Sequence, residues 1–210
     1  MKYFRMSLSL SSILVLLSYS ICTLLAFFNY RLPYSPLKNW LSDLGNKVLN
    51  PNGAIIYNTG IVLTAACLLL FFLGFSALKN SKNRIQNLMI ILTQSCGILG
   101  CVSMALSAFY SIDTPAPHSL FSAIMRISIG TAFAFSVAAL RYNPKVPKWL
   151  LILGVLTTLT NLLVSVLFNS IQVLEWPTIF LFLAYVVSVG GTMKGLTDNT
   201  AHNKSTEQNL

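Results

Sequence analysis

Charged side chains are scarce in this sequence of 210 residues. Asp, Glu, Lys and Arg make up 9% of it, whereas a soluble domain carries about 25% because its surface must meet water. Apolar residues make up 55%, and the mean hydropathy is +0.70. This composition excludes an ordinary soluble domain and predicts an integral membrane protein.

Histidine is nearly absent, and the common cofactor motifs do not occur. The two histidines are His118 and His202, so a catalytic zinc site with three histidine ligands is excluded. The sequence contains no H-E-x-x-H, Walker loop, G-x-G-x-x-G or G-x-S-x-G. We therefore predict no metal and no cofactor, and whether the chain is an enzyme stays open.

The cysteines give no sign of a disulfide framework or of thiol chemistry. All four lie within apolar runs, at positions 22, 67, 96 and 101, and no C-x-x-C motif occurs. A structural disulfide would be expected in an exposed loop of an oxidising compartment. We predict that these residues are small buried hydrophobic groups.

Long apolar runs indicate the fold. A membrane-spanning helix needs about 20 consecutive apolar residues, and an open strand cannot satisfy its backbone in lipid. Six segments meet this description or nearly do, and they predict an all-α bundle of six transmembrane helices. The predicted spans are about Leu8–Phe28, Ala54–Leu78, Leu88–Tyr110, Leu120–Leu140, Leu150–Phe168 and Pro177–Met193.

The net charge of +9 divides according to this topology rather than indicating nucleic acid. If the N-terminus is inside, 10 of the 14 cations fall on the cytoplasmic side, as the positive-inside rule requires. Both termini are then cytoplasmic, and we expect a multi-pass protein of the plasma membrane. Residues 1–195 form the predicted transmembrane domain, and residues 196–210 form a disordered cytoplasmic tail.

The first outer loop contains a pattern typical of a short helix. Ser35-Pro36 is a capping residue followed by proline, and an apolar stripe continues to Leu44 before Gly45. The stripe consists of Leu37, Trp40, Leu41 and Leu44. We predict a two-turn interfacial helix over Ser35–Leu44, anchored by Trp40.

Arg126 is the only charged residue well inside a predicted span. A charge at such depth must face protein or water, and His118, Ser122 and Arg126 follow each other at i+4 spacing, so they share one helix face. This pattern predicts a polar site at the outer end of the bundle. Its candidate ligand-binding residues are Ser42, Asp43, Asn58, Asp113, His118, Ser122 and Arg126. The alternative is a purely structural role, in which Arg126 pairs with Asp113 or Asp43 only to hold helices together.

Two stretches carry a resemblance to a known family. Ser42-Asp43-Leu44-Gly45, then Asn50-Pro51, Asn58 and Gly60, form the first stretch, and Asp113 with His118-Ser119 forms the second. This pattern resembles the domain-of-unknown-function 998 family of prokaryotic membrane proteins, and more faintly the DRAM and Sfk-type proteins. The resemblance implies a six-helix bundle with polar positions gathered on the non-cytoplasmic side, and no established activity.

Three functional hypotheses follow. The first is an outer-facing pocket that binds a lipid headgroup or a small polar or anionic ligand, through Arg126, His118 and Asp113. The second is an intramembrane lipid-modifying enzyme in which Asp113 and His118 act as acid and base. The third is a structural or assembly subunit. Membrane lipids are the expected partners, nucleic acid is not, and the oligomeric state stays open.

Overall fold

The computed structural model describes residues 2–80, 82–167 and 171–207, and in these ranges it contains helices and no strand. The long helices are α1 (Lys2–Phe28), α2 (Ala54–Gly74), α3 (Arg84–Phe109), α4 (Pro115–Leu140), α5 (Lys148–Leu167) and α6 (Glu175–Glu207). Short 3₁₀ segments are η1 (Leu41–Gly45), η2 (Phe75–Leu78) and η3 (Gln172–Leu174). The all-α prediction is therefore confirmed.

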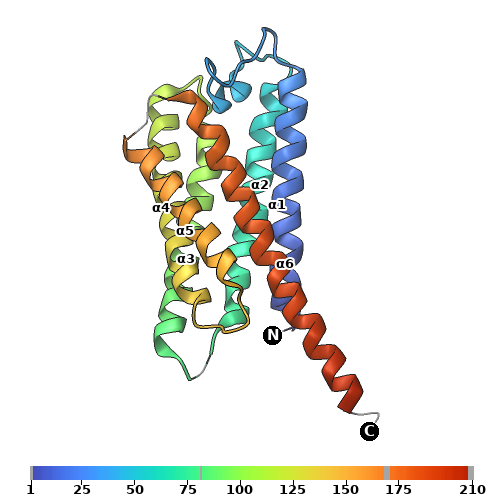
Figure 1. The fold of residues 1–210 in the computed structure, drawn as a ribbon. Helices are drawn as coiled ribbons and strands as arrows, with labels where there is room; N and C mark the ends of the chain where they lie inside the picture. The colour runs from blue at the N-terminus through green and yellow to red at the C-terminus, as the bar shows by residue number, and fades with distance from the viewer. Residues whose placement is uncertain (1, 81, 168–170, 208–210) are drawn as a thin grey trace.

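The six long helices stand side by side as a bundle (Figure 1). Each helix packs against the next one along the chain, and α6 returns to pack against α1. Within the described residues, five helical segments are long and apolar enough to cross a membrane, and they belong to α1, α2 with η2, α3, α4, and α6 with η3. The described apolar part of α5, Lys148–Val164, is shorter. These helices are those of a multi-pass membrane protein.

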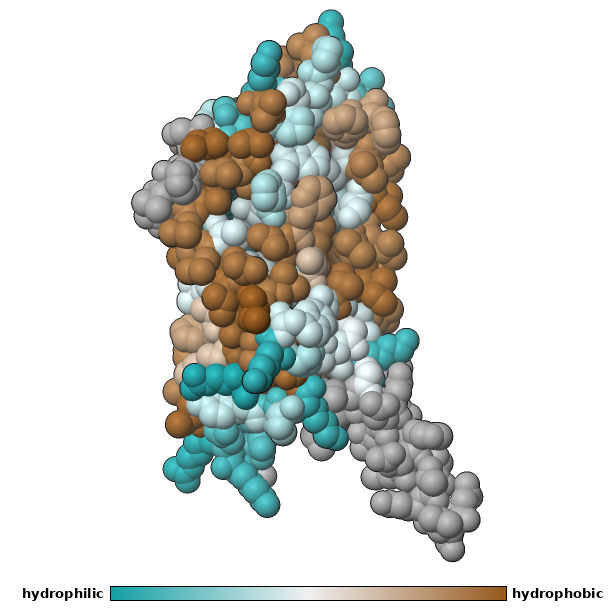
Figure 2. Space-filling view, viewed as in Figure 1, coloured by the Kyte–Doolittle hydropathy of each residue, from teal (hydrophilic) through white to brown (hydrophobic). Residues whose placement is uncertain are grey.

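The surface matches that assignment. On the face shown in Figure 2, hydrophobic side chains cover much of the middle of the bundle, and hydrophilic side chains gather toward its ends. Many large apolar side chains on this surface are exposed, among them Leu10, Ile55 and Ile152. In water such a surface would be unfavourable, because monomeric soluble proteins rarely expose large contiguous apolar patches.

Small and polar residues bring the helices together. Gly60 on α2 lies against Cys22 on α1, where an added Cβ would overlap the cysteine side chain. Gln94 on α3 donates to the carbonyls of Phe72 and Leu73 on α2, and so joins the two helices. The four cysteines are free thiols: Cys67 and Cys101 are buried, as predicted, whereas Cys22 and Cys96 are only partly buried. Such contacts replace the hydrophobic effect, which does not act between helices in lipid.

The first loop, residues 29–53, differs from the predicted two-turn helix. Its helical segment is the five-residue η1, which begins at Leu41 rather than at Ser35. Trp40 is extended, and its N–H donates to Asp43 Oδ2 at 2.9 Å, while the Asn39 side chain accepts from the N–H of Ser35. These side chains compete with the helix for backbone donors. Leu37 is consequently exposed, so the apolar stripe is broken.

The two ends of the chain lie at the same end of the bundle (Figure 1). α6 continues past Leu196 to Glu207, into the stretch that the sequence predicts to be a disordered tail. No proline or glycine follows Gly195 in the sequence, so nothing local stops a helix that the apolar part of α6 has already started. The division into a domain and a tail stays a prediction.

Candidate functional site

A cavity of about 450 Å³ lies beneath the first loop. Residues of the first loop, of α1 to α6 and of the turn between α3 and α4 line it. Its polar wall includes Ser42, Asn58, His118, Ser122 and Arg126, which are five of the seven residues predicted from the sequence. Its apolar wall includes Ile61, Met104, Ile129, Ile179 and Phe182. The cavity has the size and mixed lining of a small-molecule site.

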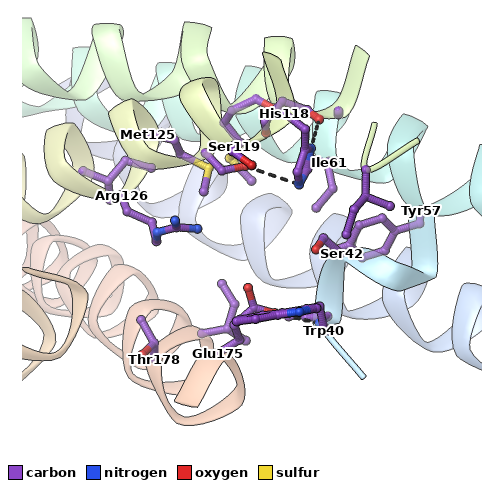
Figure 3. Close-up of a pocket in the computed structure, with 18 of the residues that line it drawn as sticks. Trp40, Ser42, Tyr57, Ile61, His118, Ser119, Met125, Arg126, Glu175 and Thr178 are labelled. Carbon is purple, nitrogen blue, oxygen red and sulfur yellow. Dashed lines mark hydrogen bonds between the residues drawn. The ribbon is translucent and has the colours of Figure 1, made fainter. Parts of the chain in front are cut away.

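Helix α4 contributes one continuous face to the cavity. His118, Ser122 and Arg126 occupy successive turns of that face, and Ile129 continues it deeper into the bundle. Figure 3 shows the Arg126 guanidinium pointing from α4 into the cavity. The three side chains that share i+4 spacing in the sequence therefore all line the same cavity.

The carboxylate facing Arg126 is that of Glu175, the first residue of α6. Glu175 lines the cavity, and its negative charge attracts the positive charge of Arg126. Glu175 Oε2 accepts a hydrogen bond from the N–H of Leu41 at 2.6 Å. The carboxylate thus joins η1 to α6, and carboxylate hydrogen bonds of this kind are among the stronger ones.

Asp113 and Asp43, the acidic residues expected in the site, do not line the cavity. Asp113 is exposed, and its two carboxylate oxygens accept from the N–H of Lys47, each at 3.1 Å. Asp113 Oδ2 also accepts from the Ser111 hydroxyl at 2.7 Å. Asp43 is buried and bonds to Trp40, and burial raises the pKa of its carboxyl above the ordinary value. Both aspartates fasten the first loop.

Two asparagines of the predicted motif also fasten the loop. Asn50 is completely buried, and its Nδ2 donates to the carbonyls of Ala26 and Leu44 at 3.0 and 2.9 Å. Its Oδ1 accepts from the N–H of Gly53. Asn58 on α2 donates to the Gly45 carbonyl at 3.0 Å, and Asn58 also lines the cavity. We call Asp43, Asn50, Asn58 and Asp113 the loop-fastening residues.

The contacts of His118 fix the arrangement of its protons. Nδ1 lies 2.8 Å from the Ser107 carbonyl and 3.0 Å from the Tyr110 carbonyl. Because carbonyls only accept hydrogen bonds, Nδ1 carries a proton. In the neutral ring Nε2 is then an acceptor, and it lies 3.4 Å from the Ser122 hydroxyl. Among the described contacts, no hydrogen bond joins His118 to Asp113.

Sequence reasoning missed several cavity residues. Glu175 is absent from the predicted site residues, because it lies just before the apolar run of the last predicted span. Asn161 is absent from them too, although it lines the cavity. Trp40 was expected to anchor a helix in the interface and instead forms part of the cavity wall, with Tyr19 and Tyr57. For Glu175 the available signal was its position at the outer end of the last predicted span, the same end of the bundle as the predicted site residues.

One comparison with known proteins found a match. The sequence model of the family described as "Protein of unknown function (DUF998)" matches residues 13–193. No curated protein and no solved structure matches the chain. The match includes the six long helices in part or in full and all of the residues that line the cavity.

Proposed function

This chain belongs to the DUF998 family of proteins of unknown function, and we propose that it binds a ligand carrying an anionic group in the cavity beneath the first loop. The ligand is a lipid headgroup or a small polar molecule, and Arg126 is its main contact. The observation that carries the proposal is the Arg126 guanidinium, which enters a cavity of about 450 Å³ from within an apolar helix. Charged residues at such depth are costly and mark ligand pathways by default.

The side chains around Arg126 suit this role. Ser122 supplies a hydroxyl one turn away, and the planar guanidinium matches the geometry of phosphate and carboxylate groups. The deeper wall is apolar, with Ile129, Met104 and Phe182, so part of an acyl chain would be accommodated there. These features favour an amphiphilic ligand over a free inorganic ion.

The test is a titration of the detergent-purified protein with two single-chain lipids, lysophosphatidylethanolamine and lysophosphatidylglycerol. Both carry the phosphate that Arg126 would contact. Arg126→Gln should weaken the binding of each by at least about 30-fold, since removing one partner of a buried charged contact costs about 2–5 kcal/mol. Arg141→Gln is the matched control, because Arg141 caps the other end of α4 and is exposed. Equal affinities for wild type and Arg126→Gln would refute the proposal.

The enzymatic alternative has no observation in its favour. Asp113 is bound to Lys47 and Ser111 outside the cavity, whereas the His118 ring contacts two carbonyls and Ser122. An acid and base pair would require both groups beside the same open space. That hypothesis stays a prediction, as does the structural-subunit hypothesis.

The orientation in the membrane is also part of the proposal: a plasma membrane protein with cytoplasmic termini and an outward-facing cavity. In support, the loop from α2 to α3 carries Lys79 and Lys82, α3 begins with Arg84, and the loop from α4 to α5 carries Lys145. These loops lie at the end of the bundle that holds both termini (Figure 1), as expected for cytoplasmic segments.

Cysteine labelling in intact cells tests this orientation. A membrane-impermeant maleimide should label Val48→Cys, whose position in the first loop is exposed. The same reagent should leave Asn80→Cys unlabelled until the membrane is permeabilised, because Asn80 lies in a loop at the opposite end. The reverse labelling pattern would overturn the orientation.

A further inference from the structure

The cavity contains charges of both signs. Figure 3 shows Arg126 and His118 on one wall and Glu175 and Trp40 on the facing wall. Arg126 comes from α4, whereas Glu175 begins α6 and is held by the N–H of Leu41. A carboxylate offers about four acceptor positions, so this one backbone contact leaves Glu175 able to accept further hydrogen bonds.

Aromatic rings surround the Glu175 side of the cavity. The cavity wall includes Trp40, Tyr19 and Tyr57. Glu175 interacts electrostatically with the hydroxyls of both tyrosines. An indole face beside a carboxylate is a chemical setting that recognises ammonium groups, because the ring quadrupole and the carboxylate both attract a cation. This side of the cavity is therefore suited to a positive group.

The opposite side is suited to a negative group. The Arg126 guanidinium and the Ser122 hydroxyl project from successive turns of α4. A ligand that is only anionic would contact Arg126 favourably but would be repelled by Glu175, and a ligand that is only cationic would meet the reverse problem. Repulsive groups of this kind set specificity.

We propose that the ligand is a zwitterion whose anionic group contacts Arg126 and whose ammonium group lies between Trp40 and Glu175. This inference rests on the proposed function and names the class of its ligand: a phosphate or carboxylate joined by a short linker to an ammonium group. Such a group occurs in the headgroup of a zwitterionic phospholipid and in free small zwitterions. A cavity of about 450 Å³ accommodates it together with apolar atoms.

The experiment compares lysophosphatidylethanolamine, lysophosphatidylglycerol and soluble glycerophosphoethanolamine on the full-length protein in detergent. The wild type should bind the ethanolamine lipid about tenfold more tightly than the glycerol lipid, the size of effect expected of a desolvated cation–π and charge contact. Glu175→Gln should abolish this preference. The amide oxygen of glutamine still accepts from Leu41, so the change removes the charge and keeps the loop contact.

Asp198→Asn is the matched control, because it makes the same chemical change at the other end of α6. This variant should retain the tenfold preference. Trp40→Leu provides a second variant that keeps an apolar group and removes the aromatic face, and it should also reduce the preference. Thermal unfolding of each variant identifies any that fail to fold.

The outcomes separate this inference from the proposed function. If the wild type binds the two lipids with equal affinity and Glu175→Gln changes neither affinity, the inference that the ligand is a zwitterion is overturned. The effect expected of Arg126→Gln would still stand. An Arg126→Gln variant that binds both lipids like the wild type would overturn the proposed function itself. Glycerophosphoethanolamine binding as tight as that of the lipid would support a free zwitterion, and preference for the lipid would support a membrane source.

Discussion

The loop-fastening residues and the two cavity charges, Arg126 and Glu175, are both polar groups at the same end of the bundle, but they differ in what they contact. Asp43, Asn50 and Asp113 each bond to backbone groups and are absent from the cavity wall. Arg126 and Glu175 both face the open space. Polarity near a membrane interface thus has two causes here: completing the backbone of a loop and forming a site.

Glu175 and Asn58 connect the two groups. Each of them lines the cavity and also bonds to the backbone of η1, Glu175 to the Leu41 N–H and Asn58 to the Gly45 carbonyl. The first loop is therefore fixed over the cavity by the same side chains that form part of its wall. A contact between a ligand and Glu175 would act directly on the segment that covers the site.

The largest expected effect is the loss of Asn50. Asn50→Ala would leave the Leu44 carbonyl and the Gly53 N–H without their partner, while the Ala26 carbonyl would keep its hydrogen bond from the Asn29 N–H. Each buried group left unsatisfied costs about 1–3 kcal/mol, so for these two groups we expect a loss of about 2–6 kcal/mol. Thermal unfolding in detergent measures it, and Asn52→Ala, at an exposed position of the same loop, is the control.

Thermal unfolding of Arg126→Gln distinguishes a binding residue from a loop-fastening residue. This variant should unfold at a higher temperature than Asn50→Ala, whereas its lipid binding should be the weaker of the two when both are measured on folded protein. If Asn50→Ala melts like the wild type, the division between fastening and binding residues is wrong.

A smaller effect is expected from Asp43, through pH. Burial raises the pKa of the Asp43 carboxyl, so the folded state binds this proton more tightly than the unfolded state does. The stability due to that proton is fully present below the unfolded pKa and is lost as the pH rises through the folded pKa. Asp43→Asn keeps an oxygen to accept from Trp40 and carries no charge.

The Asp43→Asn variant should therefore melt above the wild type at neutral pH. The difference should shrink as the pH falls toward about 4, the ordinary range of an aspartate. Thermal unfolding at several pH values measures it. A difference that is constant with pH would mean that charge at Asp43 is not the cause.

Much of the fold was predictable because the membrane limits the choices. Long apolar runs must be helices in lipid, and the five long apolar helical segments lie where the runs predicted them. The face of α4 was also predictable, since His118, Ser122 and Arg126 follow the helical repeat. The predicted interfacial helix was wrong because local side-chain contacts of Asn39 and Asp43 displaced the helical pattern.

Hydropathy and helical spacing are local properties, so the all-α membrane architecture, the family and the place of Arg126 within an apolar helix could be predicted from the sequence alone. Which acid faces Arg126 depended instead on how the helices pack. The sequence offered Asp43, Asp113 and Glu175 at one end of the bundle, and Glu175 reaches the cavity because α6 packs back against α1 and its first residue meets η1. That meeting depends on contacts between residues 134 positions apart, which no local pattern encodes.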